Sequence, residues 1–186
     1  DGNTWDGQLL SLPFNKSAYV RFDNADMRKK VGYDEAPKTW DEMQDACAKI
    51  KAQGLAPYGY AMRSTLESLT TLLYANGGQF LNDEGTKMAL DKPEARETIE
   101  FLYEIIFEEK VAYVESDYLD RGFAAEKFAM YISSTAGFPY NERSVAGRFD
   151  WRVAPIPSKD PNAPRRTLMQ GTNIGIYSNT TPAERE

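Results

Sequence analysis

Arg63 is the side chain best placed for binding chemistry, because it lies between an expected strand and an expected helix. Residues 58–62 have the short apolar pattern of a strand, and Ser64 with Glu67 has the spacing of a capping box that starts a helix. An arginine beside a helix N-terminus can donate a fork of hydrogen bonds to two hydroxyls, a carboxylate or a phosphate. Open α/β sheets bind small polar ligands at such junctions, although a solvated surface arginine shows the same local pattern.

Two groups of carboxylates also suggest chemistry, and their surroundings differ. Asp117 and Asp120 could form a hydrolase pair, because two acids held about 5–10 Å apart across a cleft can cleave a glycosidic bond. No motif surrounds either acid. The other group has helical spacing opposite an apolar stripe, which indicates a solvated helix face. It consists of Glu100, Glu104, Glu108 and Glu109.

The composition limits the classes of function. With 186 residues, of which 41 % are hydrophobic and 27 % charged, the chain can bury a globular core. A net charge of −6 argues against binding nucleic acid, and no apolar run approaches the ~20 residues of a membrane span. The chain has no histidine, which lowers the odds for zinc sites and histidine-dependent triads. Its one cysteine, Cys47, lies on an apolar helix stripe and is expected to be buried. No cofactor is expected.

The clearest local signal is the start of a helix at Thr39. The Thr39 hydroxyl can cap this helix, and Glu42 can reach back to the backbone N–H of Thr39. Gly54 follows as the expected left-handed stop. The apolar stripe of this helix recurs at three- and four-residue steps and comprises Trp40, Met43, Cys47 and Ile50.

Further strands and helices are expected along the rest of the chain. Strands are expected at residues 8–12 after an Asp6-Gly7 turn, and at residues 58–62, 128–132, 151–156 and 167–177. Helices are expected to open at Asn24, Ser64, Asp91 and Pro139, and the one from Asp91 is expected to reach about Lys110. The inner faces of two helices are expected at Leu66, Leu69, Leu72 and Leu73, and at Ala95, Ile99, Leu102, Ile105 and Ile106.

The order of these signals resembles the extracellular solute-binding proteins of ABC importers, in the large group that binds sugars and related polyols. In that family a strand leads to Asn-x-Asp at a helix start, then to a short Gly/Asp loop and a helix that opens with Pro-x-Thr-Trp-Asp-Glu. Residues 19–32 and 37–43 follow this order. The resemblance extends to nearly the whole chain. A second piece covers residues 123–132, where Glu126 stands in place of the usual glycine.

The resemblance implies an α/β fold, a periplasmic-binding-protein-like lobe with a mixed sheet flanked by helices. It implies that residues 1–186 are a single domain, the second lobe of a longer two-lobed protein. Two crossing hinge strands are expected at about residues 8–22 and 167–177, with the lobe body at 23–166. A helix start at Thr181, with Pro182 next, has only one turn of chain after it, so we expect a fragment.

The resemblance also implies which residues face the ligand cleft. Asn15 and Ser17 would lie at its mouth. Ser134 and Thr135 would hydrogen-bond sugar hydroxyls, and Phe138 or Tyr140 would stack on the apolar face of a sugar ring. The expected ligand contacts also include Arg63 and Ser64 and, further along the chain, Gln170, Gly171 and Thr172. Most family members have Gly-Gly at this last place, and this chain has Gln170 in place of the first glycine.

The implied function is a non-catalytic, extracytoplasmic carbohydrate-binding lobe that serves an ABC transporter, in the periplasm or anchored at the cell surface. Its partners would be a small sugar or polyol, the missing first lobe and the permease subunits, without nucleic acid. Residues 10–17 also resemble members that bind glycerol phosphates, so a polyol-phosphate binder is one alternative. A glycoside hydrolase that uses Asp117 and Asp120 is the alternative from another class.

Overall fold

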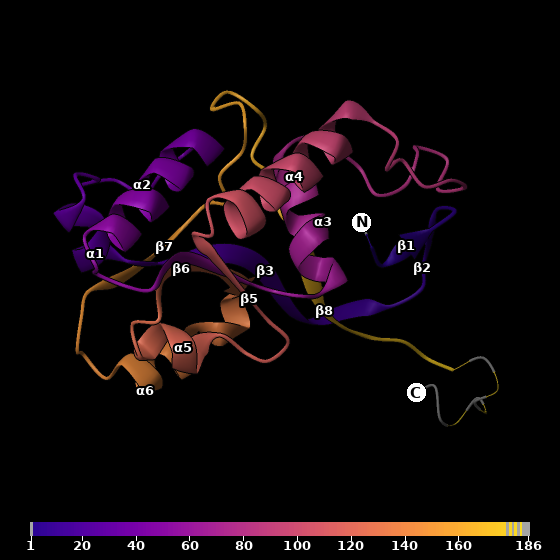
Figure 1. Ribbon diagram of the computed structural model, residues 1–186. Coiled ribbons are helices and arrows are strands. Elements are labelled where there is room, and N and C mark those ends of the chain that lie inside the picture. The colour runs from indigo at the N-terminus through magenta and orange to yellow at the C-terminus, as the bar shows by residue number, and fades with distance from the viewer. Residues whose placement is uncertain (1, 178, 180, 182, 184–186) are drawn as a thin grey trace. The chain divides into compact units, whose positions relative to one another are not determined.

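The computed structural model describes residues 2–177, 179, 181 and 183 (Figure 1). The chain divides into a larger unit, Tyr19–Leu168, and a smaller unit formed by Asp1–Ala18 and Met169–Glu186. None of the helices in the described part of the chain is long and apolar enough to cross a membrane. The expected helix start at Thr181 and Pro182 falls partly outside the described residues.

The larger unit is built on a mixed sheet with the strand order β5-β4-β6-β3-β7. The bounds of these strands are β3 Leu12–Asn24, β4 Tyr58–Arg63, β5 Ala112–Glu115, β6 Phe128–Ser134 and β7 Trp151–Ala154. β4 runs parallel to β5 and β6, whereas β3 runs antiparallel to β6 and β7. The mixed sheet expected from the sequence is therefore confirmed. The carboxyl ends of β4, β5 and β6 lie at one edge of the sheet.

Helices cover both faces of this sheet, as Figure 1 shows, with α2, α3 and α4 on one side and α5 and α6 on the other. The helices are α1 Ala25–Lys30, α2 Trp40–Ala52, α3 Leu66–Ala75, α4 Pro93–Tyr103, α5 Asp120–Ala124 and α6 Phe138–Val145. Two short turns extend this set, a π-helix at Glu104–Glu108 and a 3-10 helix at Thr135–Gly137. Each face thus has its own hydrophobic core.

Helix α2 is fixed by local and long-range contacts. The Thr39 hydroxyl accepts from the backbone N–H of Glu42, and the Glu42 carboxylate accepts from the N–H of Thr39, so the expected capping box is confirmed. The expected apolar stripe is buried throughout. Gly59 of β4 lets this helix approach the sheet, because a Cβ there would lie 2.3 Å from the Cα of Cys47. The helix ends at Ala52, just before Gly54 at a φ of +65°.

The core beneath α2 contains a fully buried ion pair on strand β3. Arg21 Nε lies 2.7 Å from Asp23 Oδ1, and Arg21 Nη2 donates to Asp23 Oδ2 at 3.1 Å. Both side chains are 0 % exposed. Because residues alternate along a strand, Arg21 and Asp23 point to the α2 side, and Phe22 points to the other core.

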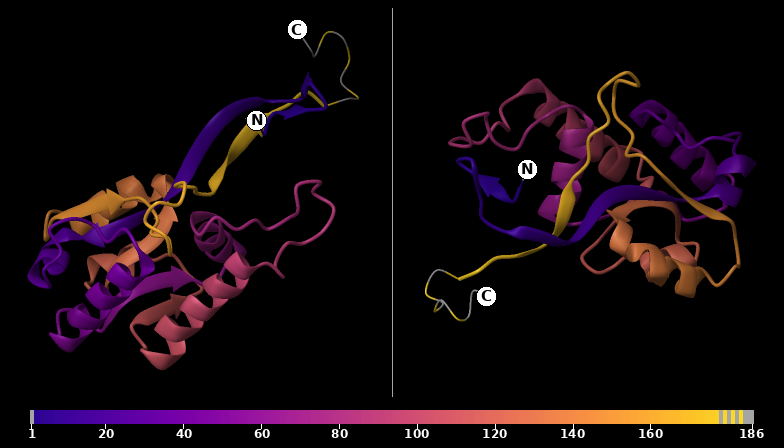
Figure 2. Two further views of the ribbon diagram at one scale, coloured as in Figure 1. Left: turned by 90° about the horizontal axis from the view of Figure 1, so that it is seen from above. Right: turned by 180° about the vertical axis from the view of Figure 1, so that it is seen from behind.

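The smaller unit consists of two antiparallel strand pairs. β1 Thr4–Trp5 and β2 Gln8–Leu9 form a hairpin around Asp6 and Gly7, which confirms that turn. Residues 12–18 of β3 pair with β8, Met169–Ile174, as the two views in Figure 2 show. At Gly171 a Cβ would lie 1.8 Å from the backbone oxygen of Asn15, so only glycine permits this approach of the two strands.

Two expected strands differ in extent from those observed. Residues 8–12 do not form one strand, because Gln8 and Leu9 close the hairpin with β1 and β3 begins only at Leu12. The long strand expected at residues 167–177 is shorter, because its pairing with β3 covers only Met169–Ile174.

Two expected helix caps are wrong. Helix α3 starts one residue later than expected, with Thr65 rather than Ser64 at the N-cap. The reason is that the Ser64 N–H donates to Glu115 O, which continues the parallel ladder of β4 and β5 past Arg63. In α4 the N-cap is Lys92 rather than Asp91, whereas the expected position of Pro93 as the first helical residue is confirmed.

The expected inner faces of α3 and α4 are confirmed in part. Leu66 and Ile99 are 57 % and 53 % exposed, so their inward assignment is wrong. Phe101, which was not expected inside, stacks on Trp40 with ring centroids 4.4 Å apart, and this contact sets the rotation of α4 and turns Ile99 outward. The carboxylates at positions 100, 104, 108 and 109 are exposed, which confirms a solvated face. Regular α-helix ends at Tyr103 and continues as π-helix to Glu108.

Replacing Glu126 by glycine should stabilise the protein. Glu126 is exposed and has a φ of +56°, a left-handed conformation that costs an L-residue roughly 1–2 kcal/mol. Glycine removes this cost but gains entropy in the unfolded chain, so we expect Glu126→Gly to raise the free energy of unfolding by about 1 kcal/mol. Urea denaturation measures the change. Glu126→Ala is the control, because it keeps the strain, and an equal gain in that variant would contradict the explanation.

Candidate ligand-binding site

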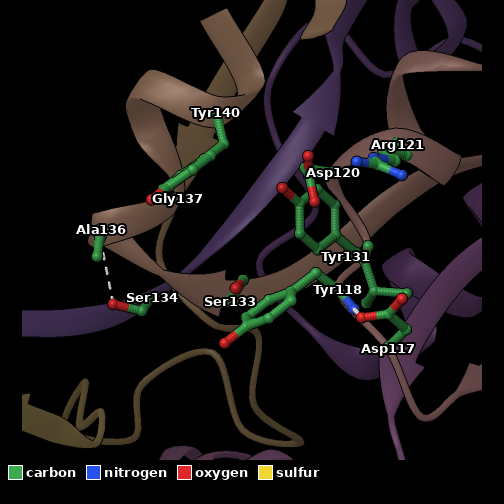
Figure 3. Close-up of a pocket in the computed structure, with 11 residues that line it drawn as sticks. Asp117, Tyr118, Asp120, Arg121, Tyr131, Ser133, Ser134, Ala136, Gly137 and Tyr140 are labelled. Carbon is green, nitrogen blue, oxygen red and sulfur yellow. Dashed lines mark hydrogen bonds between the residues drawn. The ribbon is translucent and has the colours of Figure 1, made fainter. Parts of the chain in front are cut away.

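A pocket of about 560 Å³ opens where β6 ends and helices α5 and α6 begin (Figure 3). It lies within the larger unit. Ser133 and Ser134 come from the last residues of β6, and Tyr140 comes from α6. The remaining polar lining comes from the loop after β5 and the start of α5, and comprises Asp117, Tyr118, Asp120 and Arg121.

The base of the pocket is held by a buried hydrogen-bonded pair. The Tyr131 hydroxyl donates to Asn141 Oδ1 at 2.8 Å, and Asn141 Nδ2 donates to the backbone oxygen of Gly137 at 3.1 Å. Burial raises the pKa of the Tyr131 hydroxyl, so it stays protonated and can donate. Tyr131 also stacks on Phe22 with centroids 5.0 Å apart. The polar groups at the base of the pocket therefore have their hydrogen-bond partners, and the base is rigid, before any ligand binds.

The two pocket carboxylates are already oriented by neighbours. Asp117 Oδ1 accepts from the backbone N–H of Tyr118 at 2.7 Å. Asp120 Oδ2 accepts from the Ser144 hydroxyl at 3.4 Å. A carboxylate has about four acceptor sites, so each retains capacity for a ligand hydroxyl. Within the described residues, no group of three or more cysteine, aspartate and glutamate side chains could hold a metal ion.

Arg63 ends β4 as expected, but its contacts are to the protein. Its guanidinium carbon lies 4.7 Å from the centroid of the Tyr118 ring, and Nη2 donates to the backbone oxygen of Ser116 at 3.3 Å. Arg63 also interacts with Glu67, whose pKa is lowered chiefly by a hydrogen bond from its own backbone N–H and also by the Thr65 hydroxyl and the charge of Arg63. Arg63 is thus held mainly by the loop that follows β5.

The other expected site residues fall into two places. In the larger unit, Ser134 and Tyr140 line the pocket, and the Ser134 hydroxyl also accepts from the Ala136 N–H at 3.2 Å. Phe138 packs instead on Phe22 and Trp151, with centroids 5.6 Å away in each case. Thr135 begins the 3-10 turn beside Ser134. In the smaller unit, Asn15 faces Thr172 and Ser17 faces Gln170 in the β3–β8 register, with Gly171 opposite Lys16.

Sequence reasoning missed Tyr118 as a pocket residue. Tyr118 is 72 % exposed, and Figure 3 shows its ring near Ser133. The available signal was an aromatic residue between Asp117 and Asp120. Because β4 and β5 are parallel neighbours, the loop after β5 meets the end of β4, where Arg63 lies.

Comparison with known proteins gives a consistent match. The family model of the bacterial extracellular solute-binding protein matches residues 1–184. The sn-glycerol-3-phosphate-binding periplasmic protein UgpB of Shigella dysenteriae is 30 % identical over 182 residues, covering 91 % of this chain and 41 % of UgpB. UgpB of Brucella abortus is 24 % identical over 183 residues, with 93 % and 42 % covered. The chain therefore spans less than half the length of these relatives.

Solved structures agree on the fold. A Thermotoga lettingae solute-binding protein bound with α-D-tagatose is 29 % identical with a TM-score of 0.77, covering 98 % of this chain and 49 % of that one. UgpB from Mycobacterium tuberculosis in complex with glycerophosphocholine has a TM-score of 0.83 at 19 % identity, with 98 % and 46 % covered. Maltose-bound MalE3 of T. maritima has a TM-score of 0.77 at 24 % identity, with 99 % and 49 % covered.

These findings define the class as an α/β, periplasmic-binding-protein-like lobe with a pocket at the ends of its strands. The chain belongs to the bacterial extracellular solute-binding protein family. The resemblance found in the sequence is thereby confirmed, as is the α/β fold of the lobe. Members of this family are binding proteins rather than enzymes.

Removing the amide of Asn141 should destabilise the floor of the pocket. Asn141→Ala leaves the Tyr131 hydroxyl and the Gly137 carbonyl without this partner in a buried place, so we expect a loss of about 2 kcal/mol in the free energy of unfolding. Chemical denaturation measures it. Asn162→Ala is the matched control, because Asn162 is exposed and should change stability by less than about 0.5 kcal/mol. Equal losses in the free energy of unfolding for the two variants would show that the buried hydrogen bonds of Asn141 do not stabilise the protein.

Proposed function

We propose that this chain forms the second lobe of an extracytoplasmic protein that binds a sugar or polyol for an ABC importer and catalyses no reaction. Membership of the extracellular solute-binding family supports this proposal. The observation that supports the proposal most strongly is the pocket at the ends of β6 and β5, which combines aromatic rings, hydroxyls and carboxylates. Sugars require this combination, because they present hydroxyls around a ring with apolar faces.

The exposed apolar side chains of the smaller unit support a missing first lobe. Leu12 and Phe14 of β3 are 59 % and 72 % exposed, and Met169 and Ile174 of β8 are 66 % and 56 % exposed. Soluble proteins rarely leave such a group uncovered, so we propose that the other half of the protein packs on these strands. In this proposal the segments at about residues 8–22 and 167–177 are the crossing hinge strands, residues 23–166 are the lobe body, and the two lobes close over the solute.

The proposed ligand contacts differ in their structural support. Ser134 and Tyr140 line the pocket, and Arg63 contacts the pocket residue Tyr118. Ser64 is proposed from its place beside Arg63 at the junction of strand and helix. The remaining contacts are proposed from the family resemblance alone and comprise Asn15, Ser17, Thr135, Phe138, Gln170, Gly171 and Thr172. The transporter's permease subunits are proposed as partners, in the periplasm or at a membrane-anchored position.

A polyol phosphate is the second candidate ligand, since several relatives are named for binding sn-glycerol 3-phosphate. The hydrolase alternative has less support. Asp117 and Asp120 both line the pocket, but no motif surrounds either acid, and the family consists of solute-binding proteins. We therefore propose binding rather than cleavage at this pocket.

Arg63→Ala in the intact protein should weaken solute binding at least tenfold, a loss of about 1.4 kcal/mol. The reason is that Arg63 contacts both Ser116 and Tyr118 in the loop that forms one wall of the pocket. Isothermal titration calorimetry with maltose, tagatose and sn-glycerol 3-phosphate measures the affinity. Arg96→Ala is the control, because Arg96 is exposed on α4 outside the pocket. An unchanged affinity for Arg63→Ala would show that Arg63 has no part in solute binding.

The 186-residue chain alone should bind the same solute only weakly, at about millimolar affinity, because half of the proposed contacts are missing. NMR titration should show shifts clustered at residues 62–66, 133–140 and 170–172. Shifts spread evenly over the chain, or gathered around the exposed face of α4, would count against the proposed site.

A further inference from the structure

We propose that Tyr118 is the aromatic platform of the pocket, that Arg63 is a positioning residue that holds it, and that the pocket therefore selects the uncharged ring of a sugar over a phosphate. This inference rests on the proposed function and names the solute class of the same site. It assigns Arg63 a role through Tyr118 instead of a direct contact with an anion.

Tyr118 presents a free aromatic surface to the pocket. It lines the pocket, and the residue is 72 % exposed although the neighbouring Leu119 is buried. Figure 3 shows the ring near Ser133, whereas the Tyr140 side chain extends from α6 toward Gly137, apart from Tyr118. An exposed tyrosine ring gains by covering its apolar face, and few side-chain torsions are lost when it does so.

Arg63 holds this ring and its loop from the end of β4. The guanidinium lies over the Tyr118 ring at 4.7 Å, and Nη2 donates to the Ser116 carbonyl two residues earlier. Both contacts fix the same loop, whereas Nε is buried and out of reach of a solute. Arg63 is not among the described residues that line the pocket. A cation over a tyrosine ring contributes about 0.5–2 kcal/mol, sufficient to favour one position of an exposed side chain.

The charges that do line the pocket disfavour a phosphate. Asp117 and Asp120 bring two carboxylates, against the one guanidinium of Arg121. Figure 3 shows the Arg121 side chain on the far side of Asp120 from Tyr140. Carboxylates accept hydrogen bonds from sugar hydroxyls, as do the Ser133 and Ser134 hydroxyls, but they repel a phosphate.

The test uses the intact protein, with maltose, tagatose and sn-glycerol 3-phosphate as probes in titration calorimetry. The wild type should bind at least one of the sugars at least tenfold more tightly than the phosphate. Tyr118→Ala should weaken sugar binding at least tenfold, whereas Tyr118→Phe, which keeps the ring, should stay within about threefold. Arg63→Lys, which keeps a cation over the ring, should also stay within about threefold. Tyr103→Ala is the matched control, since Tyr103 is 54 % exposed on α4 outside the pocket.

A double-mutant cycle separates positioning from direct contact. If Arg63 acts through Tyr118, Arg63→Ala should weaken sugar binding in the wild type and add nothing in the Tyr118→Ala background. Additive losses, or unchanged sugar affinity in Tyr118→Ala, would overturn the inference while leaving the proposed function intact. Preferred binding of sn-glycerol 3-phosphate that Arg63→Ala abolishes would overturn it as well. If none of the probes binds, the proposed function fails and the inference fails with it.

Discussion

The structure depends most on the buried ion pair between Arg21 and Asp23. Both charges lie on β3, which pairs with β6 on one side and β7 on the other. Charges this deep are tolerated only with close partners, and removing one of a buried pair generally costs about 3–5 kcal/mol. One face of β3 must therefore stay packed against α2, and the strand must keep its register with β6. In that register Val20 lies opposite Ser133, and Tyr19 lies opposite Ser134, so the same constraint sets where the pocket begins.

The opposite face of β3 explains why the pocket is aromatic and rigid. Phe22 stacks on Tyr131 and meets Phe138 edge-on, and Tyr131 pairs with Asn141 at the floor of the pocket. Fully satisfied polar groups packed among rings leave little freedom for rearrangement. What is left to face solvent is the loop after β5, which carries Tyr118 and the carboxylates. A fixed floor with one exposed wall is the arrangement that a small polar solute needs for a defined orientation.

Local signals in the sequence predicted the elements well, and long-range contacts explain the failures. The capping box at Thr39 involves residues three apart, so it could be read directly. The cap at Ser64 could not, because Ser64 bonds instead to Glu115 on a neighbouring strand. Ile99 turned outward because Phe101 stacks on Trp40, a contact between different helices. Tyr118 escaped notice for the same reason, since its partner Arg63 meets it only through the order of strands in the sheet.

The close approach of α2 to Gly59 has a practical consequence for Cys47. This residue is the single cysteine of the chain, it is 1 % exposed, and burial raises the pKa of its thiol well above the usual range. A thiol that is both covered and protonated reacts slowly with alkylating reagents. A cysteine introduced on the surface would thus be the one readily labelled position in this chain, without prior removal of the native residue. A fluorophore attached near the rim of the pocket could turn the protein into an optical sensor for the proposed solute.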